Sequence, residues 1–200
     1  MTTAAINAAL TLLDAAHDTI GGLRPEAPRL ARWAELIAGR LHRGGMVLTA
    51  GNGGSATHAA HLAGELVGRF RHERRSLRAV CLTADGSTLT ALGNDYGFER
   101  IFARQVEGLA GRDDVVVLFS TSGRSPNVLE AVTAARQCGA LTLAFTGPAP
   151  NPLQRVADDA VAVDGADAAS IQDAHHVGLH AVCVALDHVL GLPQPVEAMT

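Results

Sequence analysis

Residues 46–55 read MVLTAGNGGS, and this stretch decides the fold class of the chain. MVLTA (46–50) is a short apolar run of the kind that forms a strand buried on both faces. The segment Gly51–Ser55 lets the backbone turn tightly, and a helical pattern follows from Ala56 to Arg69. A strand, a glycine-rich turn and a helix in this order predict one unit of a parallel α/β sheet.

Four further apolar runs predict the rest of the sheet. They are LRAVCL (77–82), DVVVLF (114–119), ALTLAF (140–145) and DAVAV (159–163), and helix-length segments separate most of them. Because strand–helix repeats with right-handed crossovers build a doubly wound sheet, we expect an α/β fold with five parallel strands. Ligands of such sheets bind outside the carboxyl ends of the strands, so the site is expected there.

Two amphipathic helices precede the sheet, and a long helix follows it. Gly21-Gly22 and Pro25 separate the first two, and residues 168–190 predict the last one, which Gly191 and Pro193 end. We expect residues 1–43 to cover a sheet edge or form an oligomer interface, and residues 44–200 to form the α/β core of one domain. The apolar positions of the helical pair are Ile6, Leu10, Leu13, Ile20, Leu30, Trp33, Ile37 and Leu41.

Composition excludes several classes of protein. The chain has 200 residues, 48% of them hydrophobic, and a net charge of −4 from 16 basic and 20 acidic side chains, which excludes disorder and gives no sign of nucleic-acid binding. Three distant cysteines do not form a disulfide framework, and no apolar run is long enough to span a membrane. Because the first residues lack the pattern of a signal peptide, we expect a cytoplasmic protein.

Two loops at strand ends are suited to binding an anion. The Gly51–Ser55 turn points a helix N-terminus at its ligand, with Ser55 as a candidate cap, but it is neither a dinucleotide fingerprint nor a P-loop. Residues 120–126 (STSGRSP) follow the third strand and offer hydroxyls and backbone amides to one phosphate group. An ordinary turn and a loop that caps its own helix are the alternatives. We expect a small phosphate monoester as ligand, and no nucleotide cofactor.

Ionisable residues on two helices are candidates for proton transfer. His61 and Glu65 lie four residues apart on one helical face, and Glu65 and His180 both stand in apolar surroundings. An ionisable group there is costly without a partner or a role, and a carboxylate with an imidazole suits proton transfer near neutral pH. A solvated helix face is the alternative. Other polar residues of these helices are His58, Gln172, Asp173, His175 and His176.

Four blocks of the sequence resemble a known family in both content and order. They are GNGGSATHAAHLAGELVGRF (51–70), LTALGNDYGFERIFARQVEG (89–108), FSTSGRSPNVLEA (119–131) and IQDAHHVGLHAVCVALD (171–187). They are similar to bacterial phosphoheptose isomerases of the sugar isomerase (SIS) family, and the resemblance spans about residues 30–190. It implies a SIS-type three-layer α/β/α fold with a five-stranded parallel sheet and N-terminal helices that pack a homotetramer. It further implies conversion of sedoheptulose 7-phosphate to D-glycero-D-manno-heptose 7-phosphate through an enediolate.

The resemblance also implies a role for each matching position. Glu65 would move the proton between C1 and C2 of the sugar, and His180 would be the partner acid. Some members of the family bind zinc, so the resemblance implies zinc ligands at His61, Glu65, Gln172 and His180, although a zinc-bound Glu65 is a weaker base. The implied substrate contacts are Asn52, Gly53, Gly54, Ser55, Asn94, Asp95 and Gln172, with Ser120, Thr121, Ser122 and Ser125 on the phosphate.

Departures from the family pattern keep other functions open. Arg124 replaces the usual asparagine of the serine loop, His58 and His176 are atypical, and FTGPAPNPLQ (145–154) replaces the common loop after the fourth strand. One alternative is an isomerase of a related phosphosugar in secondary metabolism. Others are a non-catalytic SIS protein that binds the replication initiator and a phosphosugar-sensing regulator. The presence of both Glu65 and His180 favours an enzyme.

Overall fold

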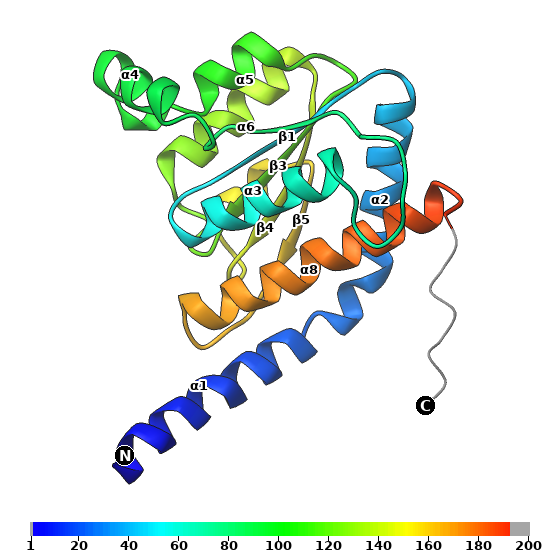
Figure 1. Ribbon diagram of the computed structural model, residues 1–200. Coiled ribbons are helices and arrows are strands. Elements are labelled where there is room, and N and C mark those ends of the chain that lie inside the picture. Colours follow the sequence, from blue (N-terminus) through cyan, green and yellow to red (C-terminus); the bar gives the residue numbers. More distant parts are fainter. Residues whose placement is uncertain (1, 193–200) are drawn as a thin grey trace.

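Five parallel strands form the centre of the structure, a computed structural model that describes residues 2–192 (Figure 1). They lie in the order β2-β1-β3-β4-β5, so the five-stranded parallel sheet predicted from the sequence is confirmed. Neighbouring strands β1 and β3 pair in register from Val47 opposite Val115 to Gly51 opposite Phe119. The strands are β1 (Val47–Gly51), β2 (Ala79–Cys81), β3 (Val115–Ser120), β4 (Leu141–Thr146) and β5 (Asp159–Ala162).

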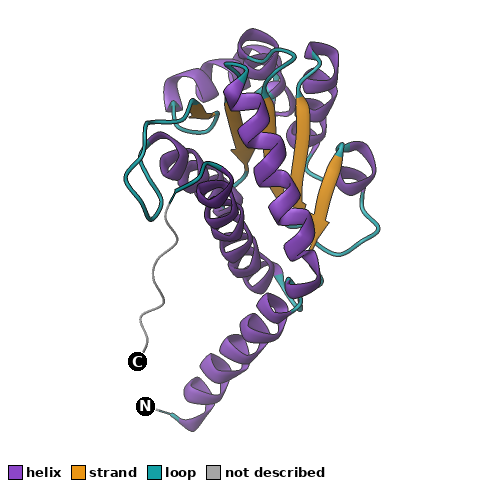
Figure 2. Cartoon of the chain, turned by 90° about the vertical axis from the view of Figure 1, so that its right-hand side faces the viewer, coloured by secondary structure: helices purple, strands orange, loops and turns teal. Residues whose placement is uncertain are grey.

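Helices cover both faces of this sheet, which gives the three layers of the fold (Figures 1 and 2). The first face carries α2 (Ala27–His42), α3 (Gly54–Val67) and α8 (Ala168–Val189), with α1 (Thr3–Gly21) packed on α8. The second face carries α4 (Gly86–Tyr96), α5 (Ala103–Leu109), α6 (Pro126–Cys138) and α7 (Pro152–Val156). Two short 3₁₀ helices, Arg24–Glu26 and Phe98–Arg100, join α1 to α2 and α4 to α5.

Strand β3 shows why the apolar runs are continuous. Val115, Val117 and Phe119 belong to the core under α2, α3 and α8, whereas Val116 and Leu118 belong to the core under α5 and α6. Successive side chains of a strand point to opposite faces, and here both faces are covered by helices. Residues 115–119 of β3 are therefore all apolar, with no polar alternation.

The two N-terminal helices differ in what they bury. Leu30 and Ile37 of α2 are 3% and 1% exposed and belong to the core, so of the two uses expected for residues 1–43, α2 covers the sheet edge and its stripe is not left for an interface. Trp33 anchors α2 at the sheet edge, where its Nε1 donates to Asp159 Oδ2 at 2.8 Å and its ring meets Phe145 edge-on. Helix α1 instead projects from the rest of the molecule (Figure 2). Its exposed apolar residues are Ile6, Leu10, Leu12 and Leu13.

Helix α8 begins and ends close to where the sequence predicts. Asp167 caps its first turn by accepting from the Ser170 amide at 2.8 Å. Gly191 has a positive φ of 74°, a conformation that favours glycine and ends helices, while Pro193 lies outside the described residues. Between residues 2 and 192, no helix combines the length and the apolar character that crossing a bilayer requires.

Candidate active site

The carboxyl ends of β1 and β3 form a crevice in the middle of the sheet. These strands are neighbours, but α3 follows β1 onto one face and α6 follows β3 onto the other. The two chains therefore diverge at this point, which is where open parallel sheets bind their ligands. The sequence analysis expects the site at this same place.

A small cavity of about 90 Å³ lies in this crevice. It brings together the turn after β1, the loop after β3 and one residue of α8, three segments that are far apart in the sequence. Polar side chains dominate its lining, as a phosphate site requires. The lining residues are Asn52, Ser55, Phe119, Ser120, Thr121, Ser122, Ser125 and Gln172.

Asn52 is held in place by a residue that the sequence analysis did not single out. Its amide exchanges two hydrogen bonds of 2.8 Å with the amide of Asn127, which is 1% exposed in the first turn of α6. This pair ties the turn after β1 to the helix after β3 and fixes the width of the crevice. In the sequence, Asn127 stands out only as a polar residue near the start of an expected helix, and that signal is weak.

The hydroxyls of the serine loop are not consumed by capping. Ser125 is the N-cap of α6 but makes no side-chain cap bond, and its Oγ lies 3.2 Å from Ser120 Oγ. Gly123 has a φ of 60°, and a Cβ there would clash with the Asn151 side chain, so only glycine fits this tight loop. The loop therefore presents hydroxyls and backbone amides beside a helix N-terminus, as anion binding requires.

The first turn of α3 differs in detail from the expectation. The helix begins at Gly54, with Gly53 as its N-cap at a φ of 55°, so Ser55 lies inside the helix and is not its cap. Gly54 lets Gln172 approach closely, since a Cβ there would lie 2.5 Å from the Gln172 side-chain oxygen. The N-termini of α3 and α6 both border the cavity and contribute partial positive charge to it.

Helices α3 and α8 run side by side in the same direction, and their contacts keep a nearly constant sequence offset (Figure 1). Gln172 faces Gly54, His176 faces His58 with 3.4 Å between their Nδ1 atoms, and His180 faces His61. These offsets are 118 or 119 residues. The seam between the two helices thus carries polar contacts from the cavity toward their C-terminal ends.

A carboxylate and two imidazoles meet on this seam. His61 Nε2 lies 2.9 Å from His180 Nε2 and 3.1 Å from Glu65 Oε1, so the structure brings together the predicted base and its partner acid. The Glu65 side chain is 21% exposed, which leaves it partly desolvated but open to a ligand. Three groups that each accept or donate a proton are therefore within reach of one another.

Burial favours the neutral form of three histidines on the seam, His58, His176 and His180. It lowers the pKa of His180, and the nearby imidazoles of His176 and His61 lower it further. The pKa values of His58 and His176 are lowered for the same reasons, burial first and imidazole neighbours second. Burial also lowers the pKa of His175 to about 4. A neutral His180 at pH 7 can both give and take a proton, as an acid–base partner must.

The same histidines could hold a metal ion. One ring nitrogen of each of His61, His176 and His180 lies within 4.8 Å of the other two. Of the four ligands that the resemblance implies, His61, Glu65 and His180 come together, while Gln172 lies at the serine-loop cavity. Imidazole nitrogens are good ligands for Zn²⁺, so the donor set fits this ion.

Asn94 and Asp95 lie apart from the cavity. Both are exposed in the last turn of α4, where the Asn94 amide donates to Asp95 Oδ1 at 2.8 Å. Neither lines the cavity of this chain. Their expected contact with sugar hydroxyls stays a prediction.

An ion pair that the sequence analysis missed closes the seam beyond Glu65. Arg74 donates to the carbonyl oxygens of Glu65 at 2.6 Å and Leu66 at 3.0 Å, and its Nε lies 3.5 Å from Asp187 Oδ1 of α8. The two charged side chains are 5% and 4% exposed. Arg74 thus satisfies the last carbonyls of α3 and joins that helix to α8.

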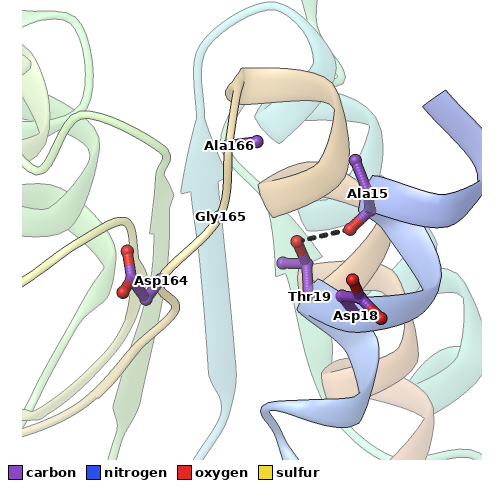
Figure 3. A pocket seen from close by; sticks show the side chains of 6 residues that line it. All are labelled: Ala15, Asp18, Thr19, Asp164, Gly165 and Ala166. Atoms are coloured by element: carbon purple, nitrogen blue, oxygen red, sulfur yellow. Dashed lines mark hydrogen bonds between the residues drawn. The ribbon is translucent and has the colours of Figure 1, made fainter. Parts of the chain in front are cut away.

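A wider hollow of about 470 Å³ lies between α1 and the segment before α8 (Figure 3). The Thr19 hydroxyl in it already donates to the Ala15 carbonyl at 2.7 Å. Asp18 and Asp164 supply carboxylates, which repel a phosphate group. The smaller serine-loop cavity is therefore the better phosphate site, despite its size.

Known proteins resemble the chain over most of its length. Residues 13–147 match the SIS domain family. A phosphoheptose isomerase of Geobacter sulfurreducens is 46% identical over 181 residues, covering 90% of this chain and 93% of that protein. One of Streptomyces coelicolor is 45% identical over 171 residues, covering 86% and 74%. The solved phosphoheptose isomerase of Francisella tularensis superposes with a TM-score of 0.84 at 36% identity, covering 94% of this chain and all of that one.

These likenesses agree with the geometry of the crevice, where an anion cavity lies on the same helical seam as a carboxylate–imidazole pair. The identity to both curated relatives is above 40% over more than four-fifths of the chain. The chain belongs to the SIS domain family and, within it, to the phosphoheptose isomerases, which are aldose–ketose isomerases.

Proposed function

We propose that this chain converts sedoheptulose 7-phosphate to D-glycero-D-manno-heptose 7-phosphate. The observation that carries the proposal is the serine-loop cavity at one end of the α3–α8 seam, with Glu65 and His180 further along it. Along α3, Gly54 and His61 are separated by about 10 Å at 1.5 Å per residue. A substrate that fills both places needs its phosphate far from its reacting carbons, as in a heptose 7-phosphate.

The phosphate end of the substrate would bind first to fixed donors. Ser120, Ser122 and Ser125 would donate hydroxyl protons to its oxygens, and the amides at the start of α3 and α6 would add to them. Asn52 and Gln172 would face the sugar next to the phosphate. Because the Asn52–Asn127 pair holds the crevice at one width, little reorganisation accompanies binding.

The chemical step would use Glu65 and His180 at the other end. The Glu65 carboxylate would take the proton from the carbon next to the carbonyl group, which leaves an enediolate, and would return it to the neighbouring carbon. His180, neutral at pH 7, would give a proton to one substrate oxygen and take one from the other. Charge develops on oxygen in this intermediate, and the nearby imidazole N–H groups would stabilise it.

Zinc is the proposed ion at the histidines of the seam. A Zn²⁺ ion bound there would polarise the substrate oxygens as a Lewis acid. The support is the convergence of His61, His176 and His180 and the preference of the ion for imidazole nitrogen. The three free cysteines are compatible with the reducing cytoplasm proposed as the location of the enzyme.

A panel of purified ketose phosphates tests the function directly. We expect the protein to turn over sedoheptulose 7-phosphate faster than shorter ketose phosphates, measured as aldose formation. Turnover of another phosphosugar alone would favour an isomerase of secondary metabolism. Binding of phosphosugars without turnover of any would favour a non-catalytic SIS protein.

Ser122→Ala is expected to raise KM about tenfold or more, because a hydrogen bond to a charged group contributes roughly 1.5–3 kcal/mol. The Ser122 hydroxyl is exposed and accepts only the Arg124 amide at 3.2 Å, so its loss leaves the fold intact. The value of kcat should change much less, since the substitution is remote from Glu65. Ser76→Ala, in an exposed loop, is the matched control, and equal KM values for the two variants would contradict this role.

We propose that the chain assembles as a homotetramer through α1. Leu10 and Leu13 are 51% and 64% exposed on a helix that projects from the molecule, and exposed apolar patches of this kind mark contacts between proteins. In a tetramer with closed symmetry and two interfaces per subunit, these exposed leucines of α1 would be buried in every copy.

Leu10→Glu with Leu13→Glu is expected to dissociate the assembly, because each buried carboxylate would lack a partner. Light scattering after size exclusion should give four times the 20.7 kDa chain mass for the wild type and a lower mass for the variant. Thr133→Glu on exposed α6 surface is the control and should keep the tetramer. A wild-type monomer, or a double variant that stays tetrameric, would overturn the proposal.

A further inference from the structure

We propose that the zinc site of this chain is built from three histidines, His61, His176 and His180, with Glu65 and Gln172 outside the coordination shell. This inference rests on the proposed zinc binding and changes its ligand set. It assigns to His176 the place among the zinc ligands that the resemblance gives to Gln172. It also assigns a role to His58, a second residue that the family pattern does not explain.

The ring nitrogens of the three histidines already converge. His61 Nε2 and His180 Nε2 lie 2.9 Å apart, and a nitrogen of His176 is within 4.8 Å of both. Ligands about 2.0–2.1 Å from a tetrahedral ion are separated by roughly 3.4 Å, so small side-chain rotations suffice. Two neutral imidazoles that face each other can share only one proton, whereas a divalent cation binds the lone pair of each.

Gln172 is held away from this group. Its amide lies against the backbone of Gly54 and lines the serine-loop cavity. His180 is eight residues further along α8, about 12 Å along the helix axis, and His176 lies halfway between them. Of the side chains on this face of α8, His176 is therefore the one placed next to His180, and Gln172 remains with the phosphate end of the site.

His58 supplies the second contact that a metal-binding histidine needs. Its Nδ1 lies 3.4 Å from His176 Nδ1, and its ring is 9% exposed. If His176 binds the ion through Nε2, its Nδ1–H donates to His58 Nδ1, which then carries its own proton on Nε2. Outer partners of this kind fix the tautomer and the ring orientation of a ligand. His58 Nε2 is buried without a hydrogen-bond partner, so the N–H of this tautomer stays unsatisfied, a cost that the contact with a metal-bound His176 has to offset.

A zinc site of three histidines also removes the conflict between two roles of Glu65, metal binding and proton transfer. A carboxylate bound to zinc is a poor base, whereas Glu65 beside His61 at 3.1 Å can stay uncoordinated and basic. Three protein ligands leave the fourth position of the ion open, which is the arrangement of catalytic zinc sites. The chain can thus hold an ion and keep Glu65 as its base. With an ion bound, His180 would be a ligand and would no longer transfer protons, so the ion would act on the substrate oxygens in its place.

Metal binding itself tests the ligand set, by equilibrium dialysis with Zn²⁺ and by the absorption spectrum of the Co²⁺ form. We expect one ion per chain in the wild type and a tetrahedral Co²⁺ spectrum. His176→Ala should weaken Zn²⁺ binding about 100-fold or more, because outer partners alone account for roughly 10–100-fold. His58→Asn should weaken it by about 10–100-fold with the same stoichiometry.

Gln172→Ala and His42→Ala are the matched controls. Gln172→Ala should keep the affinity and the Co²⁺ spectrum while impairing turnover, and His42, exposed at the end of α2, should not affect either. Circular dichroism confirms that each variant is folded. Loss of metal in Gln172→Ala but not in His176→Ala, or a wild type that binds no Zn²⁺, would overturn the proposal. Isomerase activity of the wild type in chelator is measured separately and tests the function alone.

Discussion

Glu65→Gln is expected to lower kcat by about 10²–10⁴-fold or more, the range typical for loss of a general base. Glutamine has nearly the same shape and can keep a hydrogen bond to His61 Nε2, which lies 3.1 Å from Glu65 Oε1. It cannot accept a proton from carbon. The variant should therefore bind the phosphosugar and unfold like the wild type while failing in turnover.

Steady-state kinetics and a phosphosugar binding assay separate these effects. Glu73→Gln serves as the control, because Glu73 is 88% exposed at its side chain and lies outside the seam. His180→Gln should be impaired to a similar extent as Glu65→Gln, since both groups act on the same proton transfers. More than about a tenth of wild-type turnover in Glu65→Gln would assign the base to another group.

The strands and the anion cavity could be predicted because their signals are local. The central strands β1, β3 and β4 are almost entirely buried, so an apolar run appears directly in the sequence, as at residues 115–119 of β3. The serine loop follows such a strand immediately, and parallel topology places it next to the turn at Gly53. A strand prediction and one topological rule together predict where the candidate site lies.

The seam between α3 and α8 could not be predicted in the same way. Its contacts depend on how two helices 118 residues apart are aligned, and no local pattern encodes that offset. His58 and His176 therefore appeared only as unusual residues of the family pattern. Arg74 had no signal at all, since it lies in an irregular segment among other arginines.

Amphipathic helices posed a third difficulty. The stripes of α1 and α2 look alike in sequence, yet Leu30 is 3% exposed and Leu13 is 64% exposed. Periodicity identifies an apolar face but not the surface that covers it. Helix α2 packs on the sheet through contacts such as that of Trp33 with Phe145, which joins residues 112 positions apart and so leaves no local signal.

Arg74→Met is expected to destabilise the fold by about 3–5 kcal/mol, the usual cost of removing one partner from a buried ion pair. The substitution leaves Asp187, 4% exposed at its side chain, without its cation. It also removes the donor to the carbonyl oxygens of Glu65 and Leu66 at the end of α3. Urea unfolding followed by circular dichroism measures the change, and Arg75→Met, at an exposed neighbouring position, is the matched control.

A double-mutant cycle distinguishes the ion pair from the helix cap. Arg74→Met with Asp187→Leu removes both charges, so the double variant should be more stable than Arg74→Met alone even though α3 still lacks its cap. Additive losses would show that the pair contributes nothing beyond the cap. Because the pair joins α3 to α8 beyond the reacting groups, Arg74→Met should also lower kcat by disturbing the 2.9 Å contact between His61 and His180. A variant that unfolds like Arg75→Met would show that the seam is held by its apolar contacts instead.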